Sequence, residues 1–251
     1  MSDYIIGLAC LALTSGAAIV GNSLAYRLPD HHLSAESRQT ISVSMAVVGM
    51  LTAMVLGLSL SSANTSFADR QDKIVKMGTQ IILVNDLLTR YGLEASDARA
   101  KLRAFTLAKH QQLFGQSHAS VTDEVDAFRR LELTQEAILA LKPKDDRQRW
   151  IQSQAADISS KIFETRWLLE ERPEGNIPDV FVLLVISWLT LVFFSFGLCA
   201  PANTTTMSII LVGAAAVSLA IMMILELDTP LAGIISVSDR PFRDAIAHMG
   251  L

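Results

Sequence analysis

Four long apolar runs, arranged in two pairs, constrain this chain more than any other feature. Each run holds roughly 20 residues with almost no charge, enough for an α-helix to cross about 30 Å of hydrocarbon. The runs are Tyr4–Tyr26, Ile41–Ala63, Val180–Ala200 and Met207–Leu227, and one polar insert separates the two pairs. The sequence therefore predicts an all-α integral membrane protein, with four transmembrane helices and a helical cytoplasmic domain between the second and third.

This pattern divides the chain into four expected parts. Residues 1–63 form a first transmembrane hairpin, 64–177 the cytoplasmic helical domain, 178–228 a second hairpin, and 229–251 an amphipathic cytoplasmic tail. The first run does not resemble a signal peptide, because its leader Met-Ser-Asp lacks positive charge and its apolar stretch is too long. We expect this run to stay attached as a membrane helix.

Basic residues near the runs gather on one side of the predicted membrane, whereas the other side holds only Arg27 and Arg38. Because cytoplasmic loops carry the excess of Lys and Arg, both termini and the insert are predicted to be cytoplasmic. The net charge of −4 argues against nucleic acid as a partner, since a phosphate binder needs a basic face. The basic residues on the predicted cytoplasmic side are Arg70, Lys73, Lys76, Arg166, Arg172, Arg240 and Arg243.

The insert is typical of α-helix throughout. Apolar residues recur every seven positions after the second run, so its helix is predicted to continue into the cytoplasm without a break. These residues are Phe67, Ile74, Ile81 and Leu88. Further helices are expected from near Ser96, from Ser120 or Thr122 to before Pro143, and over Asp145–Glu171. The narrow apolar stripes predict an elongated bundle or a coiled-coil stalk.

The insert holds little that indicates chemistry. His110 and His118 are eight residues apart, without the Cys or His spacing of a helical metal site, and we interpret both as solvated. The acidic pairs 145–146 and 170–171 lie at helix ends, where solvated capping is the simpler interpretation. No glycine-rich phosphate loop or nucleophile motif is present, so we expect neither an enzyme nor a cofactor. Cys10 and Cys199 lie at opposite ends of their helices, too far apart for a disulfide.

The second run carries small residues at three-to-four spacing: Ser42, Ala46, Gly49, Ala53, Gly57 and Ser61. One interpretation is a tight hairpin with the first run, whose own small residues are Cys10, Thr14, Ala17, Gly21 and Ala25. The other is that this face lines an axial pathway in an oligomer, with Ser42, Gly49, Thr52 and Ser59 as pore-lining residues. The aromatic-rich third run is expected to face lipid.

Two carboxylates, Glu226 and Asp228, stand where the fourth run leaves the membrane. They lie at the negative end of the helix dipole, so we expect a cationic partner, with Arg70, Arg240 and Arg243 as the choices. A ring of acidic side chains at a pore mouth is the alternative. Beyond them, a turn at Gly233, a cap at Ser238 or Asp239 and Pro241 in the first turn predict a short helix. Its apolar face, Phe242, Ile246 and Met249, is expected to lie under the membrane or against the bundle.

The segment Leu225–Ser238, together with Pro241, Arg243 and Ala245, resembles the signature of a bacterial family of membrane proteins labelled bestrophin-like. The similarity extends to Leu56-Gly57 with Arg70, to Ser187-Trp188, and to the stretch 196–203. It implies location in a bacterial inner membrane and, by way of bestrophins themselves, a pentameric anion channel with four membrane helices per subunit. Two departures stand out: Met77-Gly78 replaces the family's Glu-Ala pair, and the second run lacks the aromatic residues of a bestrophin pore.

Two hypotheses of function follow from these features. The first is a homo-oligomeric passive ion channel, with the second helix lining the pathway. The second is a membrane scaffold or signalling protein, whose cytoplasmic helical stalk binds a protein partner and whose spans act as an anchor. A membrane enzyme is the weakest interpretation, because the sequence shows no convergent catalytic set.

Overall fold

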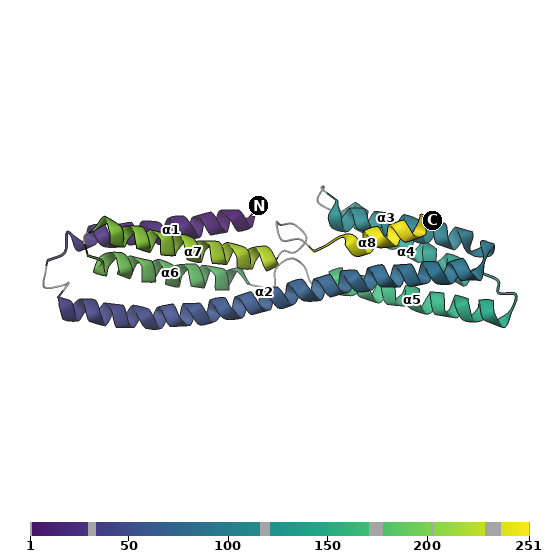
Figure 1. Ribbon diagram of the computed structural model, residues 1–251, viewed down its shortest axis with the longest axis horizontal. Coiled ribbons are helices and arrows are strands. Elements are labelled where there is room, and N and C mark those ends of the chain that lie inside the picture. The colour runs from purple at the N-terminus through teal and green to yellow at the C-terminus, as the bar shows by residue number, and fades with distance from the viewer. Residues whose placement is uncertain are drawn as a thin grey trace. The chain divides into compact units, whose positions relative to one another are not determined.

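The computed structural model describes residues 2–29, 34–115, 121–170, 178–201, 203–228 and 237–250. In this part the chain is helical and contains no strand (Figure 1). The helices are α1 (Ser2–Ala25), α2 (Ala35–Tyr91), the 3-10 turn η2 (Leu93–Ala95), α3 (Ser96–Phe114), α4 (Val121–Leu139), α5 (Asp146–Glu170), α6 (Asp179–Cys199), α7 (Thr204–Asp228) and α8 (Arg240–Met249). The predicted all-α class is confirmed.

The described residues fall into two compact units. The membrane unit holds residues 2–29, 34–67, 178–201 and 203–228, and the helical unit holds 68–115, 121–170 and 237–250. Helix α2 contributes to both, because it runs for 57 residues without interruption. The prediction that the second membrane helix continues into the insert is therefore confirmed.

Four of the described helices, α1, α2, α6 and α7, are long and apolar enough to cross a membrane. Helices α1, α6 and α7 belong to the membrane unit and α2 contributes its residues 35–67 to it, and each of the four overlaps one of the apolar runs. Since lipid offers backbone groups no hydrogen-bond partner, a helix that satisfies its own backbone is the structure these runs must adopt. The four-span prediction is confirmed.

Within the membrane unit, α1 packs most extensively against α6 and next against α7. Glycines allow this approach, because a side chain on Gly197 would collide with the carbonyl group of Ala18. A side chain on Gly21 would likewise collide with the carbonyl oxygen of Phe194. The resulting core is formed by Cys10, Ala18, Val185, Leu189, Phe193, Ala214, Ile221 and Leu225.

This packing corrects two expectations. The tight hairpin between the first and second membrane helices is wrong, since α1 and α2 make almost no close backbone contact. The expectation that the third membrane helix faces lipid is wrong for one side of α6, which carries the buried residues Val185, Leu189 and Phe193. The small residues Ala18 and Gly21 of α1 approach α6 instead, at the backbone of Gly197 and of Phe194.

In the helical unit, α3 packs on α4, α4 on α5, and α8 on α3. The heptad residues Ile74, Ile81 and Leu88 of α2 are fully buried, as the sequence pattern predicts. The starts of α3, α4 and α5 lie within about two residues of the predicted positions. The predicted turn at Gly233 lies outside the described residues.

Candidate functional site

The membrane part of α2 has two unlike faces. On one face Thr52 is 2% exposed, and its hydroxyl donates a hydrogen bond to the carbonyl of Val48 at 2.8 Å. Val55 and Leu56 lie on this side and pack against the core of the membrane unit. This face of α2 is therefore occupied within the subunit.

On the other side of α2, small side chains are uncovered, and so are the larger side chains of Val43, Val47 and Leu58. A side chain added at Gly49 or Gly57 would meet no atom of this chain within 4 Å. Met50 is 77% exposed, the most of the large apolar side chains in this span. Ser42, Ala46, Ala53, Met54 and Gly57 are exposed as well. We call Ser42, Ala46, Gly49, Ala53 and Gly57 the small face of α2.

The structure thus divides the four pore-lining residues that the sequence suggests. Ser42 is exposed on the small face and Gly49 lies half-buried at its edge. Thr52 is buried and Ser59 half-buried, both on the side that packs within the subunit. Sequence reasoning missed the exposed Met50 and Met54, although the helical period of about 100° per residue places them beside Gly57.

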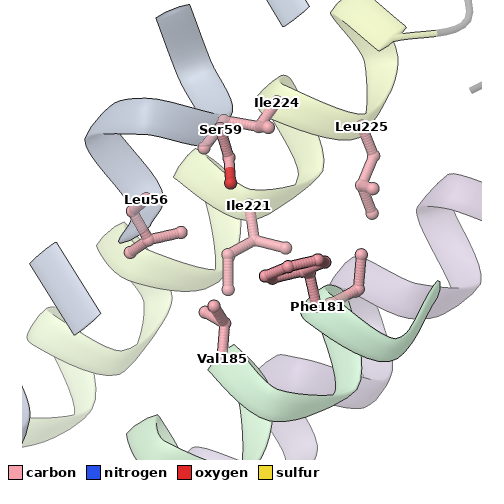
Figure 2. A pocket seen from close by; sticks show the side chains of 8 residues that line it. Leu56, Ser59, Phe181, Val185, Ile221, Ile224 and Leu225 are labelled. Carbon is pink, nitrogen blue, oxygen red and sulfur yellow. The ribbon is translucent and has the colours of Figure 1, made fainter. Parts of the chain in front are cut away.

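A pocket lies between α2, α6 and α7, where α2 meets the rest of the unit (Figure 2). Among the described residues that line it, Ser59 supplies the only side-chain oxygen, and the other side chains are apolar. The cavity is small, with a volume of about 20 Å³. The pocket lies on the covered side of α2, so it is distinct from the small face. Its lining consists of Leu56, Ser59, Phe181, Val182, Val185, Ile221, Ile224 and Leu225.

The first turn of α2 is tied to the end of α6. Arg38 donates a hydrogen bond through Nη1 to the carbonyl of Cys199 at 2.9 Å. A cation at the carbonyl end of a helix is favourable, because the helix dipole is negative there. Among described residues, α2 makes no extensive close backbone contact with α1, α6 or α7, so side chains hold it in the unit.

The two carboxylates at the end of α7 are buried, with Glu226 4% and Asp228 7% exposed. The hydroxyl of Tyr4 donates to Oε1 of Glu226 at 3.5 Å, which links the start of α1 to the end of α7. Arg240 lies 3.7 Å from Asp244, and Arg243 lies 3.0 Å from Asp239. An ion pair of the exit carboxylates with Arg70, Arg240 or Arg243 stays a prediction.

In the helical unit His110 is not the solvated side chain that the sequence suggested. Its ring lies 5.4 Å from that of Phe114 and 6.4 Å from that of Phe242, measured between centroids. Its Nε2 is 3.5 Å from Oδ2 of Asp239. His118 lies outside the described residues. No group of three or more metal-binding side chains occurs in the part of the chain that the structure describes.

The last residue of α2, Tyr91, is a buried phenol, and an ion pair of η2 lies close to it in sequence. Lys144 Nζ lies 2.6 Å from Oε1 of Glu94, which lowers the pKa of the glutamate and raises that of the lysine. Tyr91 is 3% exposed, and its hydroxyl has no hydrogen-bond partner among the described residues. Burial, followed by the charge of Glu94, raises the pKa of Tyr91.

The sequence profile of the Bestrophin-like domain matches residues 12–242. Solved structures of similar fold include a bacterial bestrophin homologue from Klebsiella pneumoniae, 14% identical, with a TM-score of 0.70 over 97% of this chain and 98% of that one. A mutant of this homologue gives a TM-score of 0.73 at 14% identity, over 100% and 99% of the two chains. A crystal structure described only as a membrane protein matches at 0.69 and 15% identity, over 97% and 98%. No curated protein matches the chain.

Proposed function

Because the chain belongs to the bestrophin-like family, we propose that it forms a homo-oligomeric ion channel with the small face of α2 toward the ion pathway. The proposal rests on one observation: residues of the same subunit do not cover this face of α2. Of the four candidate spans, α2 is the least covered by its own chain. A face of Ser, Ala and Gly that its own subunit leaves bare suits either close contact with another copy or a passage for water and ions.

The proposed pathway is passive. The span Ile41–Ala63 contains no charged residue, and the other three apolar runs hold none before Glu226. Coupled transporters and proton relays use ionisable side chains inside the membrane. An uncharged pathway instead sets conduction by its width and by the cost of dehydrating the ion. The family resemblance implies anions as the conducted species.

In this proposal the four sequence-suggested residues have two roles. Ser42 and Gly49 stand on or beside the pathway, together with Ala46, Ala53 and Gly57. Thr52 and Ser59 hold α2 against its own subunit, as the burial of Thr52 supports. Glu226 and Asp228 fix the end of α7 rather than forming an exposed acidic ring, a role supported by their burial. The proposed setting is a bacterial inner membrane, with both termini and the helical unit in the cytoplasm.

A recording of ionic current tests the proposal. The purified protein, with its oligomeric state checked by mass, is reconstituted into planar bilayers with unequal chloride on the two sides. We expect steady currents, with a reversal potential that follows the chloride gradient and shifts when gluconate replaces chloride. An assembled oligomer that carries no current with any small ion would overturn the proposal.

A second function, a membrane scaffold, is supported by the surface of the helical unit. Trp150 and Trp167 of α5 are 60% and 59% exposed, and large aromatic residues are enriched where proteins bind each other. Recovery of one cytoplasmic protein in constant ratio, lost in a Trp150→Ala and Trp167→Ala double variant, would favour this function. We rank it second because it assigns no role to the small face of α2.

A further inference from the structure

The C-terminal end of α6 is firmly packed against α1. A side chain added at Gly21 would lie 3.0 Å from the backbone nitrogen of Leu198. One added at Gly197 would lie 3.0 Å from Cα of Ala18. Both contacts fall within two residues of Cys199, the last residue of α6. Because a backbone cannot move aside as a flexible side chain can, this end of α6 is a fixed surface for its neighbours.

The same end of α6 has backbone carbonyl groups that the helix itself does not satisfy, as every α-helix does in its last turn. Ala200 follows Cys199 in an extended conformation, and Pro201 after it has no N–H to donate. Arg38 of α2 supplies a donor, because its Nη1 lies 2.9 Å from the carbonyl oxygen of Cys199. The cation lies at the negative end of the helix dipole, which strengthens this hydrogen bond.

The rest of the membrane part of α2 is held less firmly. This helix is the least covered of the four candidate spans, and among the described residues it makes no extensive close backbone contact with α1, α6 or α7. Towards the other end of the span, Leu56 and Ser59 line the small cavity beside α6 and α7 (Figure 2). Among hydrogen bonds between described residues, that of Arg38 alone links this part of α2 to another membrane helix.

We infer that Arg38 is a positioning residue of the proposed channel, whose guanidinium holds the first turn of α2 on the fixed end of α6. The small face begins at Ser42, about one helical turn beyond Arg38, so a shift of this end displaces the start of the face. The inference rests on the proposed function for its effect on conduction. The contact between α2 and α6 does not depend on that function.

A positive charge near the end of a pathway also acts on ions directly, through its electric field. Arg27 separates this effect from positioning. It follows α1 at the same end of the membrane unit, its side chain is exposed, and within the described residues that side chain makes no hydrogen bond or ion pair. Arg27→Gln therefore removes a comparable charge and leaves the hold on α2 intact.

A distance measurement between two spin labels tests the inference. The labels are placed at the exposed positions Gln39 of α2 and Thr205 of α7, after Cys10 and Cys199 are replaced by alanine. The acceptor for Arg38 is a backbone carbonyl, so alanine at position 199 retains it. Labelled subunits are diluted with unlabelled ones, so that only distances within one subunit are recorded.

We expect Arg38→Gln to raise the population of a second, displaced distance at least about tenfold, the change that follows loss of a charge-assisted hydrogen bond. Arg27→Gln should leave the distances unchanged. Arg38→Lys should give an intermediate population, because lysine keeps the charge and a donor but not the planar guanidinium. Helix content by circular dichroism should match the wild type in all three variants, since the contacts of α1 with α6 do not involve Arg38.

Currents in planar bilayers give the functional result. The closed time of Arg38→Gln should rise by the same factor as the displaced population, with an unchanged reversal potential. Distances in Arg38→Gln equal to those of the wild type, an equal change in Arg27→Gln, or a loss of helix content in Arg38→Gln would overturn the inference. A wild-type oligomer without current would overturn the proposed function instead, and the distances would still decide whether Arg38 holds α2.

Discussion

At the scale of single residues, glycine decides how α1 and α6 meet. Gly197 and Gly21 face backbone carbonyl groups of the partner helix, and a backbone cannot move aside as a flexible side chain can. By contrast, a side chain at Gly16, on the same helix as Gly21, would meet no atom within 4 Å. The sequence marks all three positions as small, and only the fold distinguishes their roles.

We therefore predict that Gly21→Ala or Gly197→Ala destabilises the membrane unit, whereas Gly16→Ala does not. Overpacking against a fixed backbone costs about 2 kcal/mol. Alanine at the open position should be neutral or slightly stabilising, since glycine is a weak helix former. Unfolding in mixed micelles, followed by circular dichroism, measures the difference. Equal stability of the Gly21 and Gly16 variants would show that the α1–α6 contact is not tight.

Tyr91 supplies a second prediction at this scale. The chain holds three tyrosines, and the raised pKa of Tyr91 means that it should ionise at a higher pH than an ordinary tyrosine, about 10. The folded state then holds this proton more tightly than the unfolded state, so stability falls as pH rises above about 10. Absorbance at 295 nm should show a late tyrosinate phase that disappears in Tyr91→Phe. A titration of the wild type without this late phase would contradict the burial argument.

At the scale of elements, α2 combines two patterns in one helix. Three of its four heptad residues, Ile74, Ile81 and Leu88, are buried in the helical unit, and that burial could be predicted from spacing alone, whereas Phe67 is half-buried and belongs to the membrane unit. In the membrane unit its small residues were compatible with two partners, α1 or an axial pathway. Small residues allow any close approach and specify none, so the sequence could not decide between them. The structure excludes α1 as the packing partner, because α1 and α2 make almost no close backbone contact.

The two faces of α2 predict a pattern of thiol labelling. In a background where Cys10 and Cys199 are replaced by alanine, cysteines at Ser42, Ala53 and Gly57 should react with a charged, water-soluble thiol reagent. Cysteines at Thr52 and Ser59 should react at least about tenfold more slowly, because these positions face the subunit's own core and a thiol reacts only where water admits the reagent. Labelling in native membranes followed by mass measurement gives the rates. Equal reaction on both faces would contradict the proposed orientation of α2.

At the scale of the whole molecule, the sequence predicted the class, the four spans and most helix starts. These features follow from apolar run length and from local capping, which involve few residues each. Which helices pack against each other could not be predicted from the sequence, because it depends on which helix backbones come close in the folded chain. The burial of Glu226 and the ring contacts of His110 were also beyond prediction, since both arise from residues distant in sequence.

The most direct test of the central claim is the unitary current of a variant in which the small face of α2 is blocked. Gly57→Trp places a large ring on that face, and Val212→Trp places the same ring on the exposed side of α7. In planar bilayers we expect the α2 variant to lose at least about tenfold in conductance, because the added ring would fill the pathway and exclude water, and the α7 variant to conduct as the wild type does. Equal conductance of Gly57→Trp and wild-type oligomers would contradict the claim that α2 lines the pathway.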